Sequence, residues 1–319
     1  MNKKLALYGL IGLLATGTAV SVAIARNPKM QPVDTTANAN TSQKIDRSPS
    51  HSMNENNLNS PGMGSNIHGD DLHGGHSATE QKVPGMVESV QAKLTVPKEI
   101  TPNQSVTLKI DVQGKSGKAI AQFDIFQEKL MHLIAVSDDF QVFQHLHPTY
   151  KGNGRFEVET NFPQPGNYTL FSDYKPSGQT EQVSVLKTKI PGKIPALPKR
   201  DLNKTKTFGD TKINLTLSQP LPKIRKEVTL TFNLQQASNN QSITDLQPYL
   251  GEKGHLVILK QSSPLTKVNY IHAHAMKDSP EGQVQFMTTF PQPGRYKLWG
   301  QFNRNGKIVV ADFWVNVVW

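Results

Sequence analysis

The chain has 319 residues, a formal net charge of +10, ten histidines and no cysteine. The length allows two domains of ordinary size, and the lack of cysteine excludes disulfides, thiolate metal sites and lipidation of a cysteine. Much of the positive charge lies between residues 187 and 226. We interpret this stretch as a solvated linker in preference to a site for polyanions or anionic membranes.

Residues 1–26 have the features of an export signal. Two lysines come first, and residues 5–25 carry no charge. Ala23-Ile-Ala25 suits signal-peptide cleavage, but the apolar run is also long enough to be an uncleaved membrane anchor. In both cases the positive-inside rule places the rest outside the cytoplasm, in the periplasm or cell envelope. We therefore expect no nucleic-acid partner. We expect contact with the membrane through residues 1–26 only.

Residues 27–85 are rich in Asn, Ser, Gly, Pro and Thr, with few periodic apolar residues. Such a composition buries too little apolar surface to offset the entropy of ordering, which predicts a disordered tether. The tether contains several methionines and the run HGDDLHGGH, so His68, His73 and His76 are weaker candidate metal ligands. The alternative is a polar linker in which the histidines are incidental.

From residue 86 the pattern changes to short alternating segments separated by turns. This spacing predicts an all-β protein with two immunoglobulin-like or cupredoxin-like sandwiches at residues 86–190 and 207–319, joined by a basic, proline-rich linker at 191–206. The expected strands are 90–96, 104–112, 119–126, 130–136, 141–147, 154–160, 166–173 and 180–187 in the first domain, and 211–217, 226–235, 254–260, 267–274, 282–288, 295–303 and 307–317 in the second.

A seven-residue motif shows that the two domains are repeats. The segment from Phe162 to Tyr168, FPQPGNY, recurs from Phe290 to Tyr296 as FPQPGRY. The two copies lie 15 and 16 residues after the last histidine of each domain. We interpret the motif as a tyrosine corner, in which the ring packs in the core and the hydroxyl bonds back to the main chain.

Each domain also has one histidine on an apolar run followed by a His-x-His pair: His132 with His145 and His147, and His255 with His272 and His274. Residues two apart on a strand share a face. Symmetric hairpins centred on Asp138-Asp139 and Ser263-Pro264 would place His132 opposite His145, and His255 opposite His272. We therefore predict a three-histidine face in each domain, forming either two separate sites or one shared site.

Three imidazoles with an open position suit Cu²⁺ or Zn²⁺. Met276 lies two residues after His274 and would share its face, and thioethers favour Cu(I), so copper is preferred and zinc is second. A structural role for the histidines, hydrogen-bonded across each hairpin, is the competing interpretation. An enzyme is not expected, because no phosphate loop, nucleophile elbow or HExxH motif is present.

Three segments resemble a known group. Leu246–Gly251 (LQPYLG), Gly254–Val257 (GHLV) and His272-x-His274 are similar to the signature of exported bacterial YtkA-like and cupredoxin-like β-sandwich domains, often described as heavy-metal or copper associated. In the first domain, His132-Leu133, His145-x-His147-Pro148 and the FPQPGNY element match the second half of the signature. The first domain lacks the PYLG element, and Ala275 replaces a proline in the second. The resemblance implies tandem sandwiches and a metal-linked role for the histidines.

We therefore expect an extracytoplasmic metal-binding protein that sequesters the ion or hands it over, with an envelope metal transporter or chaperone as its partner. Binding by neutral imidazoles should weaken as the pH falls through about 6.5. The alternative is a non-metal interaction module of the cell envelope with structural histidines.

Overall fold

The computed structural model describes residues 76–77 and 89–319, and these belong to one compact unit of the chain. The predicted signal or anchor, 1–26, and nearly all of the tether, 27–85, lie outside the described residues. Within the described ranges, no helix is long and apolar enough to cross a membrane. The architecture is all-β, with four antiparallel sheets in two repeated domains, as the sequence predicts.

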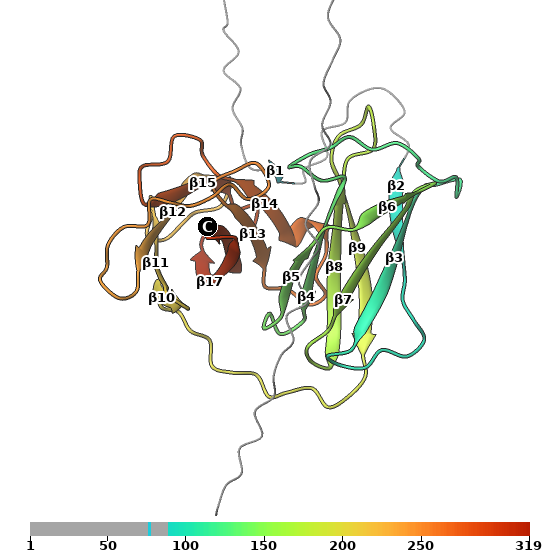
Figure 1. The fold of residues 1–319 in the computed structure, drawn as a ribbon, viewed down its shortest axis with the longest axis horizontal. Helices are drawn as coiled ribbons and strands as arrows, with labels where there is room; N and C mark the ends of the chain where they lie inside the picture. The colour runs from blue at the N-terminus through green and yellow to red at the C-terminus, as the bar shows by residue number, and fades with distance from the viewer. Residues whose placement is uncertain (1–75, 78–88) are drawn as a thin grey trace, which may run out of the picture. The chain divides into compact units, whose positions relative to one another are not determined.

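The first domain is a sandwich of two four-stranded sheets, with strand orders β2-β3-β7-β6 and β5-β4-β8-β9 (Figure 1). This is the order of the two sheets in immunoglobulin-like sandwiches. The strands are β2 (Val90–Thr95), β3 (Ser105–Gly114), β4 (Met131–Ser137), β5 (Phe143–Leu146), β6 (Thr149–Gly152), β7 (Arg155–Asn161), β8 (Gly166–Tyr174) and β9 (Gln182–Ile190).

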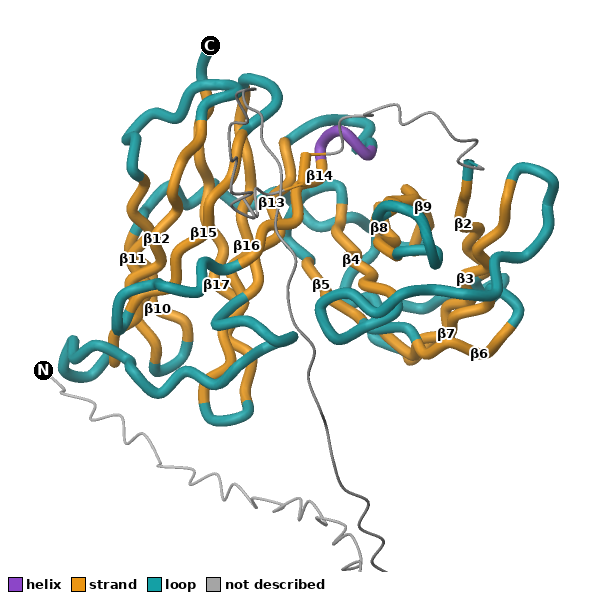
Figure 2. The backbone as a smooth tube through the Cα atoms, turned by 90° about the horizontal axis from the view of Figure 1, so that it is seen from above, coloured by secondary structure: helices purple, strands orange, loops and turns teal. Residues whose placement is uncertain are grey.

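The second domain has the sheets β10-β11-β12-β15 (Figure 2) and β1-β14-β13-β16-β17. It follows the same plan, except that β1 and β10 are each added at one edge and β6 has no counterpart. A short 3₁₀ helix, η1 (Lys267–Asn269), precedes β14. The strands are β1 (His76–Ser77), β10 (Thr205–Phe208), β11 (Thr211–Leu217), β12 (Glu227–Gln236), β13 (His255–Lys260), β14 (Tyr270–His274), β15 (Gln283–Thr289), β16 (Gly294–Arg304) and β17 (Lys307–Val317).

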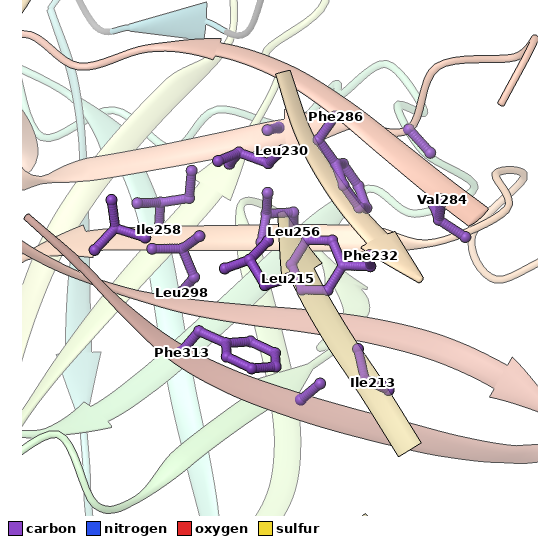
Figure 3. Close-up of a cluster of buried hydrophobic side chains, with 14 of the residues drawn as sticks. Ile213, Leu215, Leu230, Phe232, Leu256, Ile258, Val284, Phe286, Leu298 and Phe313 are labelled. Atoms are coloured by element: carbon purple, nitrogen blue, oxygen red, sulfur yellow. The ribbon is translucent and has the colours of Figure 1, made fainter. Parts of the chain in front are cut away.

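Each sandwich has its own apolar core, built from alternate residues of its strands. In β3 the buried side chains are Leu108, Ile110 and Val112, with more exposed residues between them. Leu230 and Phe232 of β12 fill the second core in the same way (Figure 3). The alternation follows from the two-residue period of a strand with one face toward a core.

β4 and β13 depart from this alternation because both of their faces are buried. All seven residues of β4 are buried, as are the first five of β13. Their second face contributes to a third apolar cluster that joins the two domains and includes Ile134, Val257 and Trp299. Phe143 of the first domain stacks on Trp299 of the second, with ring centroids 4.8 Å apart. The outward faces of the two histidine-bearing sheets therefore pack against each other.

The tyrosine corners are confirmed. The hydroxyl of Tyr168 donates to the carbonyl of Gln164 at 2.8 Å, and that of Tyr296 donates to Gln292 at 2.7 Å. Both rings are buried in their own cores, against Phe162 and Phe290 respectively.

Some expected elements differ. Residues 119–126 form isolated bridges instead of a strand, and a tight turn follows in which Gln127 and Glu128 have positive φ angles. β6 and β10 were not expected, and β10 begins inside the predicted linker. Within the predicted tether, the backbone of β1 pairs with β14, with His76 opposite His272. β14 is otherwise an edge strand, and its free main-chain groups accept such a partner.

The predicted hairpin registers are wrong by two residues in both domains. His145 pairs with Ile134, and His255 pairs with His274. The hairpins are therefore centred one residue later than expected, at Asp139-Phe140 and Pro264-Leu265. Phe140 takes a positive φ of 60° in the first turn, and η1 occupies part of the second. A two-residue shift leaves the parity unchanged, so the histidines still share the predicted faces.

Candidate metal centre

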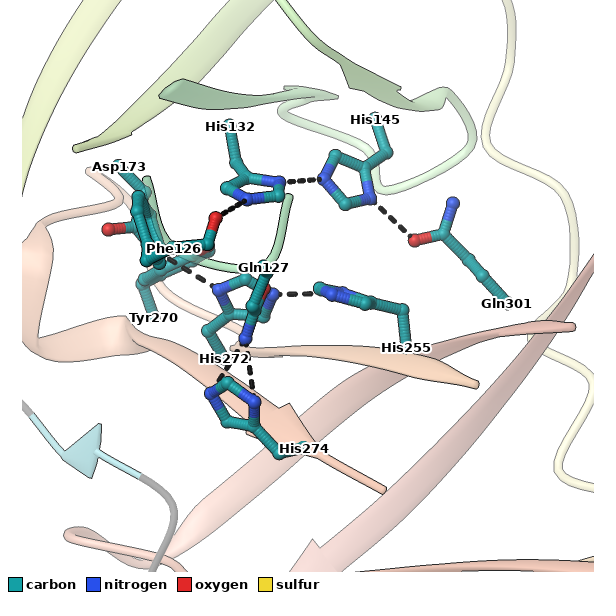
Figure 4. Close-up of polar contacts among 10 residues, drawn as sticks. All are labelled: Phe126, Gln127, His132, His145, Asp173, His255, Tyr270, His272, His274 and Gln301. Atoms are coloured by element: carbon teal, nitrogen blue, oxygen red, sulfur yellow. Dashed lines mark hydrogen bonds and ion pairs between the residues drawn. The ribbon is translucent and has the colours of Figure 1, made fainter. Parts of the chain in front are cut away.

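The six histidines of the two domains form one cluster. They lie on the outward faces of β4, β5, β13 and β14 or directly after β5, so packing of these faces brings both sets together. Figure 4 draws all of them except His147. The His132 ring lies 5.8 Å from that of His255 between centroids, and the His145 and His255 centroids are 5.3 Å apart. The structure thus places the two predicted three-histidine faces against each other.

The histidines of the first domain meet the geometric requirement for a shared ion. One nitrogen from each of His132, His145 and His147 lies within 4.8 Å of the others, and in the described part of the chain this is the single such group of His, Cys, Asp or Glu. The Nδ1 atom of His132 lies 3.0 Å from Nε2 of His145. Two imidazole nitrogens on a tetrahedral zinc ion at ~2.05 Å would lie about 3.3 Å apart, so little adjustment is needed.

The outer nitrogens of this pair both face oxygen acceptors. His132 Nε2 lies 3.2 Å from the Phe126 carbonyl, and His145 Nδ1 lies 2.8 Å from Oε1 of Gln301. With the amide oxygen of Gln301 toward His145, each outer nitrogen carries the proton that it donates to its oxygen, and a neutral imidazole has only one. The two facing nitrogens, His132 Nδ1 and His145 Nε2, then both present lone pairs. This contact is unfavourable without a cation between them and favourable with one.

The second domain has a similar chain of contacts with a different outcome. His272 Nδ1 lies 3.2 Å from the carboxylate of Asp173, and His272 Nε2 lies 2.9 Å from His255 Nδ1. With neutral rings, His272 donates to Asp173 and accepts from His255. The remaining nitrogen of His255, Nε2, then holds a lone pair, and it is buried without a hydrogen-bond partner. Carboxylates that orient a histidine in this way are typical of the surroundings of metal sites.

Two equivalent turns border the cluster. In each, the first and fourth residues exchange main-chain hydrogen bonds, Phe126 with Lys129 and Tyr249 with Glu252. The first turn directs the Phe126 carbonyl to His132 and the Gln127 side chain to His274, at 2.8 and 2.7 Å from its two ring nitrogens. His147 has no such cover, and its buried Nε2 has no hydrogen-bond partner.

Burial keeps the cluster neutral. Desolvation, with charge repulsion from neighbouring histidines, lowers the pKa of His132 to about 2 and the pKa values of His145 and His147 to about 3. The pKa of His255 is lowered well below the ordinary 6.5 for the same reasons. The rings therefore remain available as ligands below pH 6.5, and we now expect protons to compete with a metal only at lower pH than the sequence suggested.

Strand alternation does not fix the place of Met276 relative to His274, so its role as a ligand stays a prediction. β14 ends at His274, and the Met276 amide donates to the carbonyl of Gln285 next to the other sheet. Residue alternation along β14 therefore gives no prediction for the face on which the Met276 thioether lies. Of the tether candidates, His68 and His73 lie outside the described residues, and His76 is described only through its backbone pairing.

Sequence reasoning missed the residues that set the histidine tautomers: Phe126, Gln127, Asp173 and Gln301. One sequence signal was available for the interface. The runs LIAV in β4 and LVIL in β13 are apolar on both faces, which is typical of strands buried on both sides. No local signal marks Asp173 or Gln301, because each contacts a histidine about 100 or more residues away.

Solved structures with similarity to the chain include bacterial invasin, an integrin-binding protein, at 11% identity, covering 72% of this chain and 39% of invasin, with a TM-score of 0.23. Alpha-2-macroglobulin from Escherichia coli matches at 12% identity over 72% and 16% of the two chains, with a TM-score of 0.23. A two-domain fibronectin type III segment of chicken tenascin matches at 8% identity over 72% and 99%, with a TM-score of 0.22.

The chain spans less than two thirds of the length of the first two, and at these scores the likeness supports no conclusion about function. No curated protein matches this sequence. One family model, described as "Domain of unknown function (DUF8832)", matches residues 86–189 and again residues 206–318, so the chain belongs to this family as a tandem pair.

Proposed function

We propose that the histidine cluster between the two domains binds a transition-metal ion, copper in first place and zinc in second. The observation that carries the proposal is the approach of two ring nitrogens, His132 Nδ1 and His145 Nε2, to 3.0 Å, with acceptors behind both rings. Their orientation follows from the acceptors Phe126 and Gln301 behind the rings. A proton between them could also relieve the contact, but the lowered pKa values of both rings oppose this near neutral pH.

The proposal extends to a binding role outside the cytoplasm. The export signal at residues 1–26 and the Met/His-rich tether suit a protein that sequesters a metal in the envelope or passes it to a transporter or chaperone. Binding is favoured over catalysis because two surface pockets, of about 390 Å³ beside Asp138 and Lys187 and of about 680 Å³ beside Arg304 and Val309, both lack all six histidines. The resemblance to YtkA-like and cupredoxin-like domains points the same way.

Calorimetric titration of the full chain with Cu(II), with Cu(I) under reducing conditions and with Zn(II) tests the proposal. A control chain with His51, His68 and His73 changed to Ala removes ligands of the tether. We expect this control to bind a metal with a Kd of about 1 μM or below. His145→Ala should abolish that binding, whereas Gln144→Ala, on the opposite face of β5, should leave it unchanged.

The second candidate is an interdomain contact in which the histidines serve only structure. It is favoured by the burial of His132, His255 and His272 and by their ring-to-ring contacts. In that case the control chain binds none of the three ions above the level of His145→Ala. The outward sandwich surfaces would then be the functional part, as an interaction module of the envelope.

A further inference from the structure

We propose that the metal site is shared between the domains, with His255 of the second domain completing the ligand set of His132, His145 and His147. This inference rests on the proposed function and names the fourth ligand. It predicts one ion per chain, held by four imidazoles, in place of one ion per domain.

The first argument is the availability of the donor. His255 is 1% exposed, and its Nε2 atom has no hydrogen-bond partner. A buried nitrogen that is left unpaired destabilises the fold. His147 Nε2 is buried and unpartnered as well. Unpartnered ring nitrogens from both domains therefore lie in the cluster around His132 and His145. His255 is outside the group of nitrogens that lie within 4.8 Å of one another, so it would move toward an ion that the other three hold.

The second argument is ring spacing. Imidazoles on one tetrahedral ion have centroids about 5 Å apart, given metal–nitrogen bonds of ~2.05 Å. Within the first domain the centroid of His132 lies 5.2 Å from those of both His145 and His147, and the last two are 4.7 Å apart. The His255 centroid lies 5.3 Å from that of His145 and 5.8 Å from that of His132. His255 thus stands nearly as close to the first domain's pair as these two rings stand to each other.

The third argument distinguishes His255 from the other two histidines of its domain. His272 uses one nitrogen toward Asp173 and the other toward His255. His274 has both ring nitrogens against the Gln127 amide. Asp173 belongs to β8 of the first domain, so the first domain itself orients His272 and, through it, His255. We assign Asp173 and His272 as positioning residues and His255 as the ligand.

A shared ligand set would make the metal a clamp between the domains. Since the ion would bond to both, its binding free energy would add to the apolar contact that already joins them. Metal release would then loosen the domain contact, a coupling that two separate sites would lack.

X-ray absorption at the zinc edge of the Zn(II)-loaded full chain, in the background lacking His51, His68 and His73, tests the ligand set. We expect one equivalent of zinc with four imidazoles, and three imidazoles plus one oxygen ligand in His255→Gln. Because the loss of one outer partner weakens metal sites about 10–100-fold, loss of this ligand should weaken zinc affinity at least about 100-fold. The matched variant His274→Gln should keep four imidazoles.

Circular dichroism of both variants checks that they fold, and the imidazole count of the unsubstituted chain stands even if His255→Gln does not fold. Two equivalents of zinc, or four imidazoles retained in His255→Gln, would overturn the shared site while leaving metal binding intact. Absence of zinc, and of copper in a parallel loading of the same chains, the unsubstituted one included, would instead reject the proposed function itself.

Discussion

The two halves of the histidine cluster come from equivalent positions but differ at two residues. Gln127 and Leu250 both lie five residues before the lone histidine of their domain. Asp173 and Gln301 both lie directly opposite that histidine on the neighbouring strand. Asp173 contacts His272 of the second domain, and Gln301 reciprocally contacts His145 of the first. The contacts are therefore those of a duplicated, reciprocal interface.

The differences break the equivalence of the halves. Gln127 covers His274, whereas an apolar leucine stands at its counterpart and His147 keeps an unpartnered nitrogen. The Phe126 carbonyl engages His132, whereas His255 Nε2 has no such acceptor. The histidines are the same in both domains, so the residues around them decide which ring nitrogens lack a hydrogen-bond partner. A duplicated pair of histidine faces can thus become asymmetric through changes only in the residues that contact the histidines.

Acid should destabilise the folded chain at the histidine cluster, and this is the largest effect that we expect. The pKa values of His132, His145 and His147 are lower in the folded chain than the ordinary 6.5 of an unfolded one. Below pH 6.5 the unfolded state therefore binds more protons, so stability falls as the pH falls and levels off near pH 2–3. Lys129 adds repulsion on His147 in the same direction. Above pH 6.5 these rings contribute no pH dependence.

Urea unfolding of the metal-free chain at pH 8, 6.5 and 5 measures this loss before most carboxylates titrate. A chain with all three histidines changed to Gln should lose less stability over the same interval. An unchanged urea midpoint between pH 6.5 and 5 in the unsubstituted chain would contradict the assigned pKa shifts.

Trp299→Ala should separate the halves by weakening the contact that holds them together. Trp299 is 3% exposed and stacks on Phe143 of the other domain. Loss of a buried aromatic ring costs about 3–5 kcal/mol, which calorimetric or urea unfolding can measure. Trp319, which is 80% exposed, provides the matched control, and Trp319→Ala should leave the free energy of unfolding nearly unchanged. Equal effects of the two substitutions would mean that the apolar contact does not stabilise the domain pair.

Exchanging the acceptors sharpens the comparison between Asp173 and Gln301. Asp173→Asn removes the carboxylate behind His272 and should weaken zinc affinity about 10–100-fold without changing the number of imidazoles. Gln301→Glu places a carboxylate behind His145 and should strengthen zinc affinity. Both values come from competition titration with a chromophoric chelator. The assignment of Asp173 fails if Asp173→Asn binds zinc as tightly as the unsubstituted chain.

Substitutions at Gln127 and Leu250 test whether an amide next to a histidine ring competes with the metal for its nitrogen. Leu250→Gln introduces an amide next to the cluster, at the position equivalent to Gln127. If this amide competes with the metal for an unpartnered ring nitrogen, zinc affinity should fall about tenfold. Gln127→Leu, which only uncovers His274, should change the affinity little. The same titration measures both. A stronger effect of Gln127→Leu than of Leu250→Gln would place the metal on the second domain's histidines instead.

The smallest effects should come from the tyrosine corners, where the two domains are alike. Tyr168→Phe and Tyr296→Phe each remove one hydrogen bond to the main chain and should cost about 1 kcal/mol of unfolding free energy. Their effects should be equal within error by urea unfolding, and metal affinity should not change. A change in zinc affinity in either variant would show that the corner is coupled to the cluster.

The sequence by itself determined the all-β fold, its duplication, most of the strands and the common face of the histidines in each domain. These properties depend on the two-residue period of a strand and on local turn chemistry, which neighbouring residues specify. The prediction that the histidines share a face holds despite a register error of two residues in both hairpins, because the period of a strand is also two residues. The tyrosine corners were predictable for the same reason, since the hydroxyl and its acceptor lie four residues apart.

Only the tertiary structure decided that the two histidine faces meet and which nitrogens remain free. The docking of two sheets depends on shape and apolar complementarity between segments more than 100 residues apart, as with Phe143 and Trp299. The tautomers depend on Asp173 and Gln301, ordinary polar residues whose role comes from the domain that they face. The turn at Gln127 and Glu128 could not be read as a turn because neither residue is typical of a positive φ.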